Sequence, residues 1–316
     1  MNDMELFPFP VVRYRFVFRV ERAIRLPEYA GSLLRGLFGA ALRRITCLTG
    51  AARCDGCGLL RSCPYSVLFA APPPPEGHVL QSFANIPNPY VIEPPPWGER
   101  IFPEGAELVF HQVLVGRARS QLALVILAWQ QALARRVGAA EGGARLIGVW
   151  QLRADGDLQP VFDPESGGLL EHQPWLDHPV EWPDAAECTL HLLTPLRIQQ
   201  RGKPLGVRQL TARDLLITLA RRISLLAEFH ADRQLALPFA ELSRQAEGVT
   251  VNGRLQWRDW TRWSSRQEQQ MVLGGVVGQW SLHGLLVPFL PLLYLGQWLH
   301  VGKNATFGLG HYRLQV

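Results

Sequence analysis

The chain has 316 residues, which is too long for one small domain and sufficient for two. Hydrophobic residues make up 47% of it and charged residues 19%, so a wholly disordered protein is excluded. The formal net charge of +5 allows a polyanionic partner but does not require one.

The amino-terminal half alternates strand and helix patterns. Apolar residues alternate with polar ones in some segments, which is typical of strands, and recur every three or four residues in others, which is typical of helices. A cysteine-rich loop and two proline-rich stretches separate the first helix from the second strand. The expected elements are a strand at 11–20 with a largely basic outer face, a helix at 28–44 opened by Pro27, a strand at 107–115, a helix at 120–136 and a hairpin at 146–152 and 158–162.

The pattern starts again after residues 174–183, a stretch with three prolines and two tryptophans. We therefore expect an amino-terminal domain at 1–183 and a carboxy-terminal domain at 184–316. Strand, helix, strands, helix and strand, occurring twice, are typical of an α+β fold of two tandem ferredoxin-like (RRM-like, βαββαβ) domains, although other α+β folds share this order of elements. The expected elements of the second domain are a strand at 190–198, a helix at 211–230, a strand around 276–282, a helix at 284–298 and, after a glycine-rich loop, a strand at 312–316.

The opening residues lack the basic and apolar stretches of a secretory signal. The most apolar segment, 284–299, contains two prolines and is too short to span a membrane. We therefore expect a cytoplasmic protein with no membrane partner. In a reducing compartment, cysteines bind metal or pack in a core more often than they form disulfides.

Four cysteines lie close together, with a central C-x-x-C spacing: Cys47, Cys54, Cys57 and Cys63. Four thiolates at such spacing can close a tetrahedral site around zinc, and an iron–sulfur cluster is the less favoured alternative. Packing as small apolar residues is a further alternative, but it suits a polar, glycine-containing loop poorly. We expect a structural zinc site, which leaves no coordination position open for catalysis.

The carboxy-terminal segment 298–314, WLHVGKNATFGLGHYRL, resembles the glycine-rich loop that ends proteins of the RAMP superfamily. The stretches TPLRI at 194–198 and WRDWTRWSSRQEQQMVLGGVVG at 257–278 agree with this resemblance. GSLLRGLFGAALRRITC followed by CPYSVLF is similar to the amino-terminal half of the repeat-processing branch. Over residues 11–70 and 188–316, the chain thus resembles the CRISPR-associated RNA-processing endoribonucleases.

The resemblance implies an endoribonuclease that needs no cofactor for catalysis. Such enzymes bind CRISPR repeat RNA and cut precursor CRISPR RNA within each repeat to yield guide RNAs. The ribose 2′-OH attacks the adjacent phosphate, leaving a 2′,3′-cyclic phosphate and a 5′-OH. Two alternatives stay open: a non-catalytic guide-RNA-binding subunit of a CRISPR effector complex, and an adaptor that docks adaptation proteins such as an integrase or a reverse transcriptase.

The glycine-rich loop is the first candidate RNA-binding surface. Gly302, Gly308 and Gly310 let the backbone turn sharply and bring its N–H groups close to phosphate. Lys303 adds a positive charge, and Phe307 can pack under the loop or stack on a base. A glycine-rich turn before an edge strand is the alternative, and the resemblance favours RNA contact. The other RNA-binding residues expected in this domain are Arg197, Arg262 and Arg266.

The first helix is the second candidate surface. Gly31, Arg35, Gly39 and Arg43 are spaced by four residues and therefore share a face. Small residues beside arginines would let an RNA backbone approach closely. The alternative is a solvated basic face with glycines chosen for helix–helix packing. The resemblance places the scissile phosphate near this helix and thus favours RNA contact.

Cleavage by this route needs a base for the 2′-OH, a proton donor for the departing oxygen and cations around the phosphorane. Many members of the family that this chain resembles use a histidine on or after the first helix. Here no histidine precedes His78, and Ala40 is the position in GLFGAALRR where the resemblance would place one. The resemblance therefore identifies the site but leaves its base unassigned.

Two solutions are open for this missing base. Three arginines of the first helix would hold the RNA in line and stabilise charge, with a tyrosine as the proton carrier. Alternatively, His300 reaches in from just before the glycine-rich loop. The candidate catalytic residues are Arg35, Arg43, Arg44, Tyr29 or Tyr65, and His300.

Overall fold

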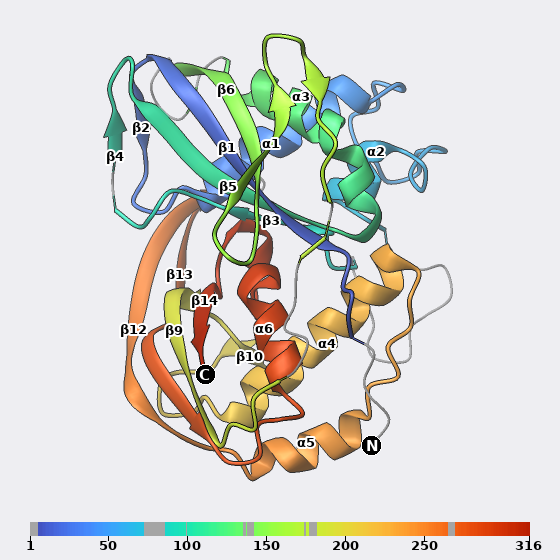
Figure 1. The fold of residues 1–316 in the computed structure, drawn as a ribbon. Helices are drawn as coiled ribbons and strands as arrows, with labels where there is room; N and C mark the ends of the chain where they lie inside the picture. The colour runs from blue at the N-terminus through green and yellow to red at the C-terminus, as the bar shows by residue number, and fades with distance from the viewer. Residues whose placement is uncertain are drawn as a thin grey trace. The chain divides into compact units, whose positions relative to one another are not determined.

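The computed structural model describes residues 6–72, 86–98, 100–134, 137, 142–173, 175, 176, 182–264 and 269–316. The chain divides into two compact units (Figure 1). The amino-terminal unit comprises residues 9–177 and 225–233, and the carboxy-terminal unit comprises 1–8, 178–224 and 234–316. In the part of the chain so described, no helix has the length and apolar character needed to cross a membrane.

A six-stranded antiparallel sheet in the order β3-β5-β1-β6-β7-β8 forms the amino-terminal unit with its helices. A separate ribbon pairs β2 (Ile24–Leu26) with β4 (Arg100–Phe102). The strands of the main sheet are β1 (Val11–Arg22), β3 (Tyr90–Glu93), β5 (Glu107–Val115), β6 (Gly143–Leu152), β7 (Leu158–Asp163) and β8 (Gly168–Leu169). The helices are α1 (Gly31–Thr46), α2 (Pro64–Phe69), the 3-10 helix η1 (Gly116–Gln121) and α3 (Leu122–Leu133).

Aromatic rings join this sheet to its helices. Phe16 of β1 lies opposite Phe110 of β5, and their rings stack at 5.5 Å. Trp129 of α3 lies 4.5 Å from Phe110, and Phe38 of α1 lies 5.1 Å from Trp129. Burying one such side chain contributes about 1.5–3 kcal/mol. These contacts hold α1 and α3 side by side against the sheet (Figure 1).

The carboxy-terminal unit has a four-stranded antiparallel sheet in the order β12-β13-β9-β14. Its strands are β9 (Glu187–Leu196), β12 (Thr250–Ser264), β13 (Gln269–His283) and β14 (Tyr312–Gln315), with a small ribbon of β10 (Gln199–Gln200) and β11 (Lys203–Pro204). Helix α4 (Ala212–Ala231) contributes residues to both units, and α5 (Phe239–Glu247), α6 (Leu290–Leu299) and the 3-10 helix η2 (Ala305–Phe307) complete the fold.

Both sheets confirm the predicted tandem ferredoxin-like fold. In chain order the amino-terminal unit runs β1, α1, β3, β5, α3, β6, and these strands lie in the order β3-β5-β1-β6. The carboxy-terminal unit runs β9, α4, β12, β13, α6, β14, and its strands lie in the matching order. Each unit is therefore one βαββαβ arrangement.

Two predicted helix starts were wrong. Helix α1 begins at Gly31 rather than at residue 28. Helix α6 begins at Leu290 rather than at residue 284, because Pro288 disfavours a helical residue before it. Pro291 is tolerated because it lies in the first turn, where its missing N–H has no intrahelical partner.

Candidate functional site

The face of α1 that carries Arg35 and Gly39 packs on α2. A Cβ atom at Gly39 would overlap the ring of Phe69, so this glycine admits a neighbouring helix. The Arg35 guanidinium lies 4.3 Å above the same ring. Gly31 is also buried, at the start of α1. The prediction that RNA approaches at Gly31 and Gly39 is therefore corrected, because protein covers both positions.

Arg35 is held among aromatic side chains. Tyr65 stacks on Phe69 at 5.4 Å, and Tyr90 lies beneath them with 1% of its surface exposed. Burial raises the pKa of the Tyr90 phenol to about 12, although the charge of Arg35 acts in the opposite direction. The Nε atom of Arg35 is buried and has no hydrogen-bond partner among the described residues. Arg35 thus serves the packing of α2 on α1.

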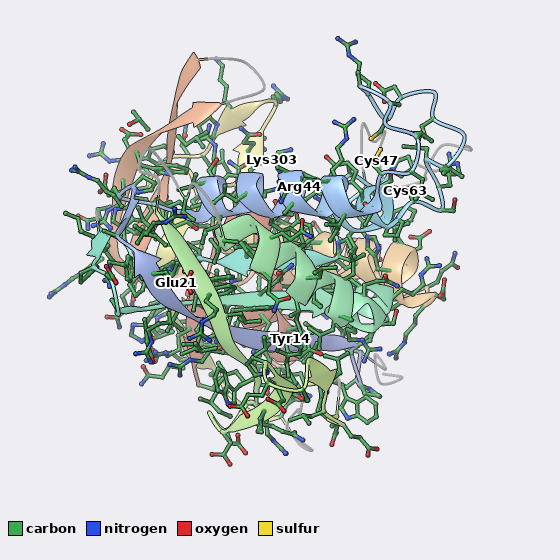
Figure 2. All side chains as sticks on the ribbon, turned by 90° about the horizontal axis from the view of Figure 1, so that it is seen from above. Tyr14, Glu21, Arg44, Cys47, Cys63 and Lys303 are labelled. Atoms are coloured by element: carbon green, nitrogen blue, oxygen red, sulfur yellow. The ribbon has the colours of Figure 1, made fainter. Side chains whose placement is uncertain are left out.

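The three arginines predicted to act together on α1 diverge. The Nη2 atom of Arg43 donates to Ala51 O at 2.5 Å and to Ala52 O at 2.9 Å, in the loop after the helix. The Nε and Nη2 atoms of Arg44 donate to Gln131 Oε1 of α3, at 3.3 and 3.2 Å. Arg44 is exposed near the end of α1 (Figure 2). Of the three, Arg44 alone reaches toward α3.

A groove with a volume of about 470 Å³ lies between α1 and α3. Arg44 and Gln131 form part of its wall, and the exposed Ala40 lies in it one helical turn before Arg44. No carboxylate pairs with Arg44 among the described residues, so its charge is not neutralised by a fixed anion. The remaining described residues of the wall are Leu37, Ala41, Ala132 and Ala134. The groove therefore combines room for a nucleotide with a guanidinium fork suited to phosphate.

The candidate proton carriers lie elsewhere. Tyr29 is 4% exposed and packs on Trp97 at 4.7 Å, and burial raises the pKa of its phenol well above the usual value. His300 has no exposed surface, and its ring stacks on His311 at 4.5 Å. A catalytic base must reach the proton that it removes, and neither side chain is accessible to do so in this conformation. Tyr65 lines the cysteine pocket rather than the groove.

The glycine-rich loop is fastened to β9. The Thr194 hydroxyl donates to Gly308 O at 2.7 Å and accepts the N–H of His311 at 2.9 Å. This explains why the TPLRI and glycine-rich motifs, more than a hundred residues apart, belong together. Thr194 was missed as an individual residue by the sequence analysis, although its motif was recognised.

The N–H groups of two glycines in the loop donate to carbonyl groups of the protein. Gly310 donates to Pro195 O at 3.1 Å, and Gly308 donates to Ala305 O at 2.9 Å. Gly302, Gly308 and Gly310 have φ values of 88°, 95° and 70°, which favour glycine. A Cβ at Gly302 or Gly310 would also overlap a neighbouring backbone carbonyl. The prediction that the N–H groups of Gly308 and Gly310 bind phosphate is therefore wrong for this conformation.

The positively charged side chains near this loop differ in whether they are free to contact RNA or are engaged within the protein. Lys303 is exposed, and its backbone N–H donates to Arg197 O at 2.8 Å. The Nη1 atom of Arg197 donates to Gly274 O at 2.7 Å, and burial lowers the pKa of its guanidinium. Phe307 is 4% exposed and packs edge-on against Trp260, so it lies under the loop. The described part of the chain does not include Arg266 or the side chain of Arg262.

The four clustered cysteines line one pocket after α1. Figure 2 shows Cys47 and Cys63 beyond the carboxy-terminal end of this helix. The Sγ atom of Cys47 lies 3.8 Å from the Thr49 hydroxyl, and this hydrogen bond is the main reason that the pKa of the Cys47 thiol is lowered. The loop thus gathers the four side chains that the sequence grouped by spacing.

Two family models match the chain. The AF_1859_N model, described as an N-terminal domain, matches residues 9–174, which is more than half of the chain. The model of the CRISPR-associated endoribonuclease Cas6 matches residues 190–312. No curated protein matches the sequence significantly.

Solved structures share the fold over nearly the whole chain. A product complex of Cas6 (TTHB231) has a TM-score of 0.57 and 17% identity, covering 96% of this chain and 99% of that one. Thermus thermophilus Cas6 (TTHB231) has a TM-score of 0.53 and 15% identity, covering 97% and 99%. A partial Cas6-RT-Cas1–Cas2 complex has a TM-score of 0.55 and 16% identity, covering 98% of this chain and 47% of that one. At these identities the likeness establishes the fold.

Proposed function

Because the chain belongs to the CRISPR-associated repeat-RNA-processing endoribonucleases of the RAMP superfamily, we propose that it cuts precursor CRISPR RNA within each repeat, with the scissile phosphate in the groove between α1 and α3. The 2′-OH on the 5′ side of the cut attacks the adjacent phosphate. The products are a 2′,3′-cyclic phosphate and a 5′-OH, and each repeat yields the end of a guide RNA.

One observation carries this assignment. Ala40, the position of the first helix where the family resemblance would place a catalytic histidine, lines the same groove as Arg44. Arg44 is exposed, has no acidic partner among the described residues and is steadied by the neutral side chain of Gln131. Arg35 and Arg43 are engaged by Phe69 and by backbone carbonyls, and they support the helix rather than the phosphate.

The groove favours charge stabilisation over side-chain proton transfer. In the reaction, a bond forms between the 2′-oxygen and phosphorus while the bond from phosphorus to the 5′-oxygen breaks. The guanidinium of Arg44 donates to the phosphate oxygens, where negative charge grows. Apart from Arg44, the described residues of the wall are leucine, alanine and glutamine, whose side chains are neither acids nor bases. Solvent therefore accepts the proton of the 2′-OH and returns one to the 5′-oxygen, without a metal ion in this step.

The carboxy-terminal unit contributes binding. Lys303 is exposed on a loop whose shape is held by Thr194 and by the three glycines with positive φ. An ammonium group on a rigid loop attracts an RNA backbone without reading its sequence. We propose that repeat RNA contacts this loop through Lys303, whereas the glycines set its conformation.

Incubation with the repeat RNA of the neighbouring CRISPR array, in EDTA, tests the proposal on a denaturing gel. We expect one discrete cut per repeat and a product whose 3′ end carries a cyclic phosphate. Tight binding of intact RNA would instead support a non-catalytic guide-RNA-binding subunit. Absence of RNA binding would contradict the proposal altogether.

A second candidate function is an adaptor for CRISPR adaptation proteins. The likeness to the chain of a Cas6-RT-Cas1–Cas2 complex, which covers 98% of this chain, supports considering it. In that case the partners would be an integrase and a reverse transcriptase, and association with them would not require RNA. Discrete cleavage of the repeat would make RNA processing the primary function.

A further inference from the structure

We propose that the loop between α1 and α2 binds one zinc ion through four cysteines, and that this ion fixes α2 against α1. The ligands are Cys47, Cys54, Cys57 and Cys63, which line one pocket of the amino-terminal unit. This proposal is independent of RNA cleavage, because it concerns how the loop is held.

The size of the pocket restricts its occupant. Its volume is about 20 Å³. That is close to the space that one water molecule needs, about 10–15 Å³, and it suits a single ion. An iron–sulfur cluster brings several metal ions and sulfides and requires more room than a single ion. Four sulfur donors around a single-ion space are the ligand set that zinc takes in closed structural sites.

The backbone of the loop directs the cysteines inward. The N–H of Cys57 donates to Cys54 O at 3.0 Å, which closes a tight turn, and Gly56 within it has a φ of 78°. This left-handed residue reverses the chain so that both ends of the turn face the pocket. The N–H of Cys63 donates to Leu59 O at 2.8 Å, so the last cysteine is also held by a local backbone bond.

The sulfur atoms are near one another but not yet at ligand distances. The Thr49 hydroxyl lies 3.8 Å from the Sγ atoms of both Cys47 and Cys57, so these two sulfurs are at most twice that distance apart. Among the described residues, no three of these Sγ atoms lie within 4.8 Å of one another. Zinc bound to thiolates at about 2.3 Å would draw them to a mutual spacing of about 3.8 Å. Binding therefore requires the loop to contract around the ion.

The loop connects directly to the contacts that hold α1 and α2. Cys47 follows the last residue of α1, and Cys63 immediately precedes the first residue of α2. Arg43 of α1 donates to two carbonyls inside the loop. Phe69 of α2 covers Gly39 of α1. A metal ion that draws the four cysteines together would shorten the connection between α1 and α2. It would also lower the conformational entropy of this loop in the unfolded chain, which favours the packing of α2 on α1.

Metal analysis of the full-length protein, purified without chelator, tests the proposal. We expect one zinc per chain in the natural protein and in a Cys188→Ser control, since Cys188 is buried in the carboxy-terminal unit and does not line the cysteine pocket. The double variant Cys54→Ser/Cys57→Ser should contain none. Iron in place of zinc, no metal in the natural protein, or a full zinc complement in the double variant would overturn the assignment.

Limited trypsin digestion tests the structural role without any variant. Arg53 and Arg61 are exposed in the loop and supply cleavage sites. A bound ion should protect them, so removing zinc with a strong chelator should speed cuts at these two residues about tenfold, with cuts elsewhere unchanged. Restoring zinc should restore protection. Equal rates of digestion with and without zinc would contradict the proposed role of the ion in fixing α2 against α1, even if zinc is bound.

Discussion

Replacing Arg44 by alanine should lower the single-turnover rate of repeat-RNA cleavage by about 10²–10³-fold. The guanidinium is the only charged group in the described wall of the groove between α1 and α3, and its hydrogen-bond partner is the neutral Gln131. Removing it leaves the developing phosphorane charge without its donor. Arg44 makes no ion pair with any described residue, so the substitution removes no such pair from that part of the fold. The rate at saturating protein measures this effect separately from RNA affinity.

Arg145→Ala is the matched control for this substitution. Arg145 lies in the same unit, and its replacement by alanine also removes one positive charge from the protein. Its side chain, however, is 64% exposed and pairs with Glu21 at 3.5 Å. Exposed pairs of this kind contribute about 0–1 kcal/mol, so cleavage should change little. An Arg44→Ala protein that cuts within twofold of the natural one would remove the groove from the mechanism.

Substituting histidine for Ala40 should raise cleavage at neutral pH, by about 10²-fold if the imidazole takes over proton transfer. Ala40 is exposed in the same groove as Arg44, and none of the described wall residues supplies a base. The helix should tolerate the change, since histidine costs at most about 0.7 kcal/mol relative to alanine.

The pH dependence distinguishes this gain from a simple improvement in binding. With solvent as the base, log rate of the natural protein should rise steadily with pH. The Ala40→His protein should instead show a break near the ordinary imidazole pKa of about 6.5. An Ala40→Gln control adds a polar side chain that does not titrate, and it should behave like the natural protein. If histidine and glutamine have equal effects, Ala40 is not near the reacting atoms.

Periodicity predicted most of the helices and strands, and the family resemblance selected the tandem ferredoxin-like fold among α+β folds. Alternation in β1 and the three-to-four spacing of α1 follow from burying one face of each element, and the repeated order of elements gave the tandem arrangement. Strand β12 was missed because its exposed edge position imposes little apolar alternation on residues 250–264. Strand β3 was missed because its four residues lie between proline-rich stretches.

The candidate site was harder to predict, because equivalent residues on one helix have different partners. Arg35, Arg43 and Arg44 are chemically alike, and the sequence offered no reason to separate them. Their roles depend on Phe69, on the carbonyls of Ala51 and Ala52, and on Gln131. Those neighbours come from distant or irregular segments, so their positions follow only from the folded chain.

Glycines were misread for a related reason. A glycine beside arginines is compatible with close approach of either RNA or protein, and the pattern does not say which. At Gly39 the neighbour is Phe69, and at Gly310 it is the backbone of the loop itself. Cysteine spacing was more informative, because all four predicted ligands line one pocket. A site is predicted more reliably from sequence when all its residues lie within one loop, because their spacing along the chain then limits their distances in the fold.

Cleavage of a repeat RNA that carries one 2′-deoxyribose, on the 5′ side of the cut, tests the central claim most directly. That substitution removes the nucleophile and leaves the rest of the backbone intact. We expect the modified RNA to bind as tightly as the natural repeat and to stay uncut, while the natural repeat is cleaved at that position. Cleavage of both RNAs at the same site would contradict attack by the 2′-OH and, with it, the proposed mechanism.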